Sequence, residues 1–329
     1  MTKLAPILEA FFTDRLLTQR QASAHTVAAY RDTFTLLLGY AVRHVGKQPT
    51  QLDVADLDAP LIAAFLQHLE IDRGNSVTTR NARLAAIRSL FRYAALRAPE
   101  HAALIARVLA VPSKRQHRPL VCFLNHEEIE ALLAAPDQTS WVGRRDHAIL
   151  LVLTQTGLRV SELTGLAVQD VHLGTGAHVF CHGKGRKDRC TPLTSQTAAV
   201  LRSWLAERHG HGHDPLFPTR RGGPLSRDAV ERLVAKHATT GASHRPSLQA
   251  KTITPHVLRH SAAMALLRAG VDITVIALWL GHESPTTTRV YLHADLAMKE
   301  QALARTTPPG TSAERYHAPD ALITFLNDL

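Results

Sequence analysis

The sequence predicts a mainly helical (α+β) protein with two domains and one small β-hairpin. Apolar residues recur at helical spacing over most of the 329 residues, and the period changes to two only between residues 177 and 192. A basic stretch at 112–119, with proline at both ends, has no periodicity at all. We therefore expect a helical domain at 1–110, a basic linker at 111–119, a second domain at 120–295 and a tail at 296–329.

Four amphipathic helices are expected in the first domain. An apolar stripe begins the chain at residues 4–12, and a second helix is expected over 26–45. Asp58 can cap a third helix over 59–71, and Ser76 can cap a fourth over 77–96, because their side chains accept hydrogen bonds from free backbone N–H groups. Four antiparallel helices of this kind would form a small bundle.

Basic residues cluster in three places that could meet a phosphate backbone. They lie on the fourth helix, in the linker and at the tip of the hairpin: Arg80, Arg83, Arg88, Lys114, Arg115, Arg118, Arg186 and Lys187. A solvated helix face is the alternative explanation for the arginines of the fourth helix. We favour contact with DNA phosphates.

The second domain should begin with a helix and contain the hairpin. Residues 125–128 (NHEE) form a capping box, and Pro136 ends the helix that follows. A buried helix is expected over 141–156, with Gly157 after it and a further helical turn over 158–163. The hairpin spans 177–192 around a glycine-rich basic tip, and helices are expected over 195–208 and 226–237.

Residues 254–291 predict three short helices, each with its own boundary signals. Thr254 can cap the first and Gly270 can end it, whereas Asp272 can cap the second and Gly281 can end it. The third can open at residues 284–285. His256 and Arg259 stand at i and i+3 and so share a face, while His282 follows the second helix and Tyr291 lies near the end of the third.

These residue types suit chemistry on a phosphodiester without a metal. Such a reaction needs a nucleophile, cations around the non-bridging oxygens and an acid for the leaving oxygen. Tyr291 could attack phosphorus, and Arg159 and Arg259 could bind the phosphate because guanidinium groups never lose their charge. Lys184 on the hairpin tip could be the acid, and His256 could act as an acid or a base. His282 could donate a hydrogen bond to the phosphate, and Glu162 could support the site with its carboxylate.

The ordered motifs resemble those of the tyrosine recombinase (phage integrase) family, and within it the Xer-type recombinases. The motifs are TGLRVSEL at 156–163, GKG at 183–185, HVLRH at 256–260, LGH at 280–282 and Tyr291. The resemblance implies a SAM-like core-binding domain followed by a catalytic domain whose residues are Arg159, Lys184, His256, Arg259, His282 and the nucleophile Tyr291.

The resemblance also implies a mechanism and partners. Tyr291 would form a 3′-phosphotyrosyl link in double-stranded DNA at an inverted-repeat core site, and four copies of the chain would exchange strands. Whether a second recombinase is a further partner stays open. No cofactor or metal is implied. Integration, excision and dimer resolution all remain open, with a mobile element favoured. Alternatives are a type IB topoisomerase and a DNA-binding protein whose catalysis has lapsed.

Composition favours a polyanionic partner and a reducing compartment. The formal net charge is +10 and the pI is about 9.9, although a basic charge could also serve solubility alone. Three cysteines without metal-ligand spacing, no signal peptide and no apolar run long enough for a bilayer predict a cytoplasmic protein without membrane contact.

Three smaller features complete the expectations. His209, His211 and His213 are spaced too loosely for a metal site. Cys181 and Cys190 are expected to face each other across the hairpin without forming a disulfide. No arm-binding domain precedes residue 1 in this reading, and a short amphipathic helix at 320–329 is expected to dock on a neighbouring copy of the chain.

Overall fold

The computed structural model describes residues 2–115, 121–183, 188–281, 288 and 291. The chain divides into two compact units, residues 1–118 and 119–329, and each is described by itself. The elements of the first unit are α1 (Leu4–Ala10), a π-helix (Phe11–Gln19), α2 (Ala24–Val45), short 3₁₀ turns (Pro49–Gln51, Val54–Asp56), α3 (Ala59–Ile71), α4 (Val77–Ala94), a 3₁₀ turn (Pro99–His101) and α5 (Ala102–Ala110).

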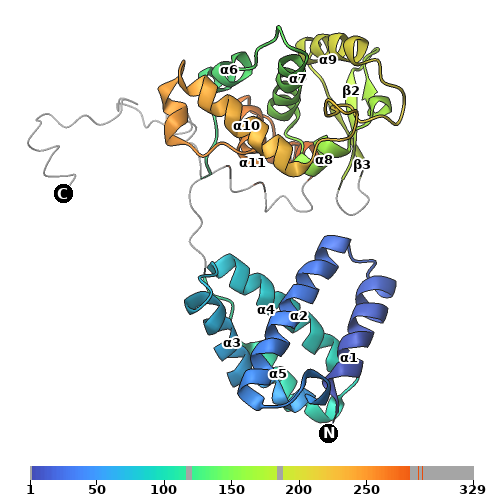
Figure 1. The fold of residues 1–329 in the computed structure, drawn as a ribbon, viewed down its shortest axis with the longest axis vertical. Helices are drawn as coiled ribbons and strands as arrows, with labels where there is room; N and C mark the ends of the chain where they lie inside the picture. The colour runs from blue at the N-terminus through green and yellow to red at the C-terminus, as the bar shows by residue number, and fades with distance from the viewer. Residues whose placement is uncertain (1, 116–120, 184–187, 282–287, 289–290, 292–329) are drawn as a thin grey trace, which may run out of the picture. The chain divides into compact units, whose positions relative to one another are not determined.

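The predicted helices of the first unit are present, and the structure adds α5. Ser23, Asp58 and Ser76 cap α2, α3 and α4 by accepting hydrogen bonds from backbone N–H groups three residues later. The core consists of fully buried side chains from every helix, among them Phe11, Leu37, Phe65, Ile87 and Val108. Helix α5 packs on α3 and α4 (Figure 1).

The segment that follows α5 is fastened to α4. Arg80 Nη1 donates to the carbonyl oxygen of Pro112 at 2.9 Å, and Arg88 donates to the Val111 carbonyl and, at 3.1 Å, to Ser113 Oγ. Asn81 exchanges two hydrogen bonds with the backbone of Lys114, at 2.9 and 3.1 Å. Residues 111–114 of the predicted linker are therefore bound to the helical unit by side chains of one helix.

The second unit surrounds a buried helix with other helices and a small sheet. Its elements are α6 (His126–Ala134), α7 (Trp141–Thr156), α8 (Val160–Gly165), a 3₁₀ turn (Val168–Asp170), β1 (Val171–His172), β2 (His178–His182), β3 (Asp188–Pro192), α9 (Ser195–Arg208), α10 (Arg227–Ala242), a 3₁₀ turn (Pro246–Ala250), α11 (Pro255–Arg268) and α12 (Ile273–Leu280). Helix α7 contacts α6, α9 and α11, which places it at the centre of the unit (Figure 1).

The predicted hairpin is part of a three-stranded antiparallel sheet in the order β1-β2-β3. Its register pairs Cys181 with Arg189 and Phe180 with Cys190. The expectation that the two cysteines face each other is therefore wrong. Because side chains alternate between faces along a strand, Cys181 is buried and Cys190 is exposed, and both thiols are free.

The boundary signals of the second unit act as predicted. Asn125 and Glu128 form the capping box of α6, and Thr254 and Asp272 cap α11 and α12. Helix α10 continues to Ala242, five residues beyond its expected end at 237. The predicted helix at residue 284, the hairpin tip and the tail lie outside the described residues.

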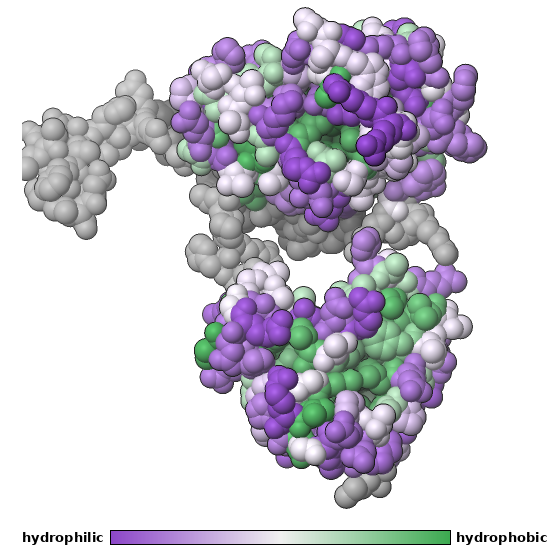
Figure 2. Space-filling model, in the orientation of Figure 1, coloured by the Kyte–Doolittle hydropathy of each residue, from purple (hydrophilic) through white to green (hydrophobic). Residues whose placement is uncertain are grey.

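The visible face of the second unit is largely hydrophilic (Figure 2). On the visible face of the helical unit, apolar residues gather in a band bordered by hydrophilic ones (Figure 2). Among the residues that the structure describes, none of the helices combines the length and the apolar character that a bilayer crossing requires.

Candidate active site

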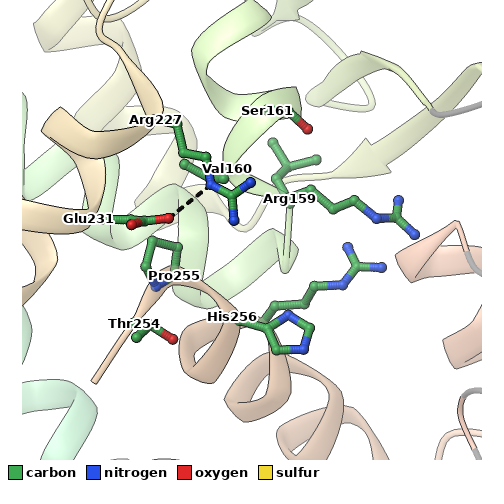
Figure 3. Close-up of a pocket in the computed structure, with 10 residues that line it drawn as sticks. Arg159, Val160, Ser161, Arg227, Glu231, Thr254, Pro255 and His256 are labelled. Atoms are coloured by element: carbon green, nitrogen blue, oxygen red, sulfur yellow. Dashed lines mark hydrogen bonds and ion pairs between the residues drawn. The ribbon is translucent and has the colours of Figure 1, made fainter. Parts of the chain in front are cut away.

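A pocket forms where the turn after α7 meets the beginning of α11. Its volume is about 520 Å³, and Arg159, His256 and Arg259 line it together with the first turn of α10. In Figure 3 the guanidinium of Arg159 lies on one side of the pocket and the ion pair between Arg227 and Glu231 on the other. Residues 159 and 256 are thus brought together from separate elements, as the predicted site requires.

Arg259 is held rigidly beneath this pocket. Its side chain is buried, and its two terminal nitrogens donate to the carbonyl oxygens of Gly157 and Leu280, each at 2.6 Å. Burial and the nearby charge of Arg159 lower the pKa of Arg259 to about 10. The side chain therefore remains cationic at neutral pH, and its fork joins the ends of α7 and α12.

Glu162 supports Arg159, as predicted, but it also binds a second arginine. Its Oε1 accepts from Arg159 Nη1 at 2.8 Å, and its two oxygens accept from Arg189 at 3.0 and 2.8 Å. Burial alone would raise the pKa of Glu162. The hydrogen bonds from Arg189 and from the Arg159 backbone outweigh that effect and bring the pKa down to about 2.

Arg189 is a site residue that sequence reasoning missed. It lies on β3, next to the hairpin tip, and its Nε donates to the carbonyl oxygen of Trp279 at 3.0 Å. Arg159 reaches the following turn, where its Nη2 donates to the Gly281 carbonyl at 3.0 Å. Together the two arginines tie α8 and β3 to the end of α12. The sequence signal that could have identified Arg189 is a basic residue within a strand, β3, that has few other charged residues.

Two glycines allow these elements to approach closely. Gly157 ends α7 and Gly281 ends α12, and both adopt the left-handed conformation, with φ of +64° and +63°. A Cβ at residue 157 would lie 2.8 Å from Leu280 Cδ2, and one at residue 281 would lie 2.8 Å from Arg189 Nη1. A side chain at either position would force Leu280 or Arg189 to move and would have to adopt a backbone conformation that residues other than glycine rarely adopt.

Tyr291 is buried, with 2% of its surface exposed, and it packs against apolar residues of α11 and α12. Its hydroxyl lies 2.9 Å from Nδ1 of His260, a residue to which sequence reasoning assigned no role. Burial raises the pKa of Tyr291, and the positive charges of Arg259 and Arg159 oppose that increase. The tyrosine therefore lies within the electrostatic reach of both predicted phosphate-binding arginines.

His256 is exposed at the mouth of the pocket, and its ring makes an edge-on contact with that of His260, the two centroids 4.1 Å apart. Partial desolvation of the ring lowers the pKa of His256, and the charges of Arg259 and Arg159 lower it further. A neutral imidazole at this place can accept a proton near neutral pH.

The other predicted residues fall into two groups. Lys184, His282, Arg118, Arg186 and Lys187 lie outside the described residues. Arg80 is buried and pairs with Glu70 at 3.8 Å, Lys114 pairs with the same carboxylate at 2.8 Å, and Arg83 donates to Thr33 Oγ1 at 3.0 Å. Arg115 is exposed. Within the described ranges, no group of three potential metal ligands forms, at His209–His213 or elsewhere.

Comparison with known proteins places the chain in a family. The model of the phage integrase family matches residues 122–298, and that of the phage integrase N-terminal SAM-like domain matches residues 10–98. The y4rC protein of Sinorhizobium fredii, named as a presumed integrase/recombinase, is 55% identical over 100% of both chains. The tyrosine recombinase XerC of Pelobacter propionicus is 34% identical over 94% of this chain and 99% of its own.

The chain belongs to the phage integrase family and is a tyrosine recombinase. Solved structures agree with this fold. The crystal structure of XerA recombinase is 25% identical, with a TM-score of 0.50 over 95% of this chain and 99% of that one. XerH bound to its palindromic difH substrate has a TM-score of 0.69 over 88% and 82% of the two chains, at 24% identity, and shows likeness of fold.

Proposed function

We propose that this recombinase cuts and rejoins double-stranded DNA at a specific site through a covalent link to Tyr291. One observation carries the proposal: Arg159, Arg259 and His256 converge on one pocket, and both arginine charges act on the buried Tyr291. Two fixed cations and a histidine around an anion, with a phenol beside them, are the groups that phosphoryl transfer through a tyrosine ester requires.

Each side chain has a proposed role that matches its environment. Arg259 and Arg159 bind the non-bridging phosphate oxygens, since hydrogen bonds to backbone carbonyls and to Glu162 hold both in place. His256 exchanges a proton with the phosphate or the leaving oxygen. Lys184 donates a proton to the 5′ oxygen, and His282 donates a hydrogen bond to the phosphate.

The proposed partner is a duplex with an inverted-repeat core site. Four copies of the chain act on it, with or without a second recombinase. XerH, the Tn1549 transposon integrase and lambda integrase are each named in complexes with DNA. The reaction conserves bond energy in the phosphotyrosyl link, so no cofactor is proposed. Action on DNA and three free thiols support a cytoplasmic location.

The set of residues proposed to contact DNA is smaller than the set that sequence reasoning suggested. Arg80 and Arg88 donate hydrogen bonds to the carbonyl oxygens of residues 112 and 111, so we propose that they hold that segment in place. Arg83 is bonded to Thr33, and Lys114 keeps an exposed ammonium beside Glu70. The residues proposed to reach phosphates are Lys114, Arg115, Arg118, Arg186 and Lys187.

A covalent trap in cells tests this function. Tagged wild-type protein and Tyr291→Phe are expressed beside the DNA that flanks the gene, the cells are denatured rapidly in SDS, and DNA attached to the recovered protein is sequenced. We expect attachment in the wild type only, at a few inverted-repeat sites. Attachment scattered over unrelated sequences would instead indicate a topoisomerase. Absence of any attachment by a protein that still binds DNA would indicate lapsed catalysis.

A further inference from the structure

The hydroxyl of Tyr291 has a specific partner on α11. Nδ1 of His260 lies 2.9 Å from Tyr291 Oη, and the two rings meet edge to face with centroids 5.4 Å apart. With its proton on Nε2, the imidazole accepts the hydrogen bond that the phenol donates. This contact joins the oxygen proposed to attack phosphorus to a group that can take its proton.

The place of His260 on α11 connects this contact to the pocket. His256 and His260 stand one helical turn apart on the same face, and their rings touch. His256 lines the pocket, whereas neither His260 nor Tyr291 does. The tyrosine hydroxyl is thus bound to a ring that stands one helical turn from His256, the histidine that lines the pocket.

We propose that His260 is a further catalytic residue, which binds the Tyr291 hydroxyl between reactions and accepts its proton when the oxygen attacks phosphorus. This inference rests on the proposed function. As Oη–P forms and P–O5′ breaks, the phenolic proton moves to Nδ1 of His260, and the 5′ oxygen takes a proton from the acid assigned to Lys184. Rejoining runs each transfer backwards, so no other reactant is consumed.

The described elements next to His260 carry few ionisable side chains. On its own helix, His256 and Arg259 flank it, and the charges of Arg259 and Arg159 both act on the neighbouring His256. The last turn of α7 (residues 153–156) and the whole of α12 carry no ionisable side chain. Arg227 and Glu231 of α10 pair with each other across the pocket at 2.9 Å. The accepting role of Nδ1 therefore rests on its 2.9 Å contact with the Tyr291 hydroxyl.

Two variants separate proton transfer from simple positioning. His260→Asn places an amide near the position of Nδ1 and can bind the phenol, but it cannot take up its proton. His260→Leu can do neither. The probe is a nicked duplex that carries the sequence recovered in the covalent trap, in which the cleaved strand end is short enough to diffuse away. Single-turnover formation of the protein–DNA adduct is measured from pH 5.5 to 9.5, with DNA binding and circular dichroism as checks on folding.

We expect the wild-type rate to rise and then level off once His260 is neutral. The asparagine variant should form adduct about 100-fold more slowly near neutral pH, with a rate that keeps rising with pH because solvent must remove the proton. His256 is present in both proteins, so its titration cannot produce the difference. The leucine variant should be at least as slow.

An asparagine variant with the wild-type rate and plateau would overturn the proposal, as would a slower variant whose rate still levels off. If His260→Asn does not fold, His260→Gln takes its place in the same comparison. A failure of the proposed function would give a different result, because wild type and Tyr291→Phe would then be equally unable to form an adduct.

Discussion

Glu162 holds Arg189 of β3 through both of its carboxylate oxygens, at 3.0 and 2.8 Å. The same carboxylate accepts a hydrogen bond from Arg159, which lines the pocket. Because Arg189 also binds the Trp279 carbonyl, one buried ion pair joins the hairpin, the turn before α8 and the end of α12. The hairpin that carries Lys184 is thereby anchored to the site it is proposed to serve.

Replacing Arg189 should destabilise the second unit strongly. In Arg189→Met, the buried Glu162 keeps only Arg159, and removal of one partner of a buried pair costs about 3–5 kcal/mol. The free energy of unfolding in urea measures this loss. Arg227→Met removes an exposed pair with Glu231 and should cost less than about 1 kcal/mol. Equal effects of the two variants would mean that the Glu162–Arg189 pair contributes no more than a surface contact.

Stability should fall in acid through Glu162. Its pKa is about 2 in the folded protein, against an ordinary value of 4.5 for a glutamate side chain. The depressed value contributes stability that is present above about pH 4.5 and is lost as the pH falls towards 2, an effect of about 3 kcal/mol. Denaturation at pH 6 and pH 3 measures it. In Glu162→Gln this part of the pH dependence should be absent, and an unchanged dependence would assign the acid loss to other carboxylates.

Gly281→Ala should harm both stability and cleavage. The substitution incurs the left-handed penalty of about 1–2 kcal/mol and brings Cβ to 2.8 Å from Arg189 Nη1. Gly270→Ala is the matched control, since its φ is +80° and nothing lies within 4 Å of the added carbon. Both variants should be less stable because alanine disfavours the left-handed backbone conformation, but only Gly281→Ala should also slow adduct formation. Equal rates of DNA cleavage by the two variants would mean that the position of Arg189 does not affect the reaction.

The contacts from α4 to residues 111–114 should protect that segment from proteases. Arg80→Met removes the bond to the Pro112 carbonyl and the pair with Glu70, so trypsin should cut after Lys114 more than about tenfold faster. Arg92 is exposed on the same helix, and Arg92→Met serves as the control. Digestion followed by mass spectrometry reports the cleavage site. Identical rates in both variants would show that Arg80 does not hold the segment.

Much of the fold and most of the described residues of the candidate site could be predicted because their signals are local. Ser76, Asp58 and Thr254 cap helices through contacts that span three residues, and Gly157 and Gly281 end helices through their own backbone conformation. The ordered motifs also predicted the family. The sequence by itself therefore determined where elements begin and end, and it identified Arg159, His256, Arg259 and Tyr291 as one set.

Only the tertiary structure decided which distant side chains meet. Arg189 reaches Glu162 across 27 positions and Trp279 across 90, and Tyr291 reaches His260 across 31. Arg80 and Arg88, which looked like a basic helix edge, instead bind the backbone after α5. Cys181 and Cys190 diverge because one residue of strand register moves a side chain to the other face. Such contacts depend on how separate elements pack together, and the hydrophobic periodicity within one element carries no information about that packing.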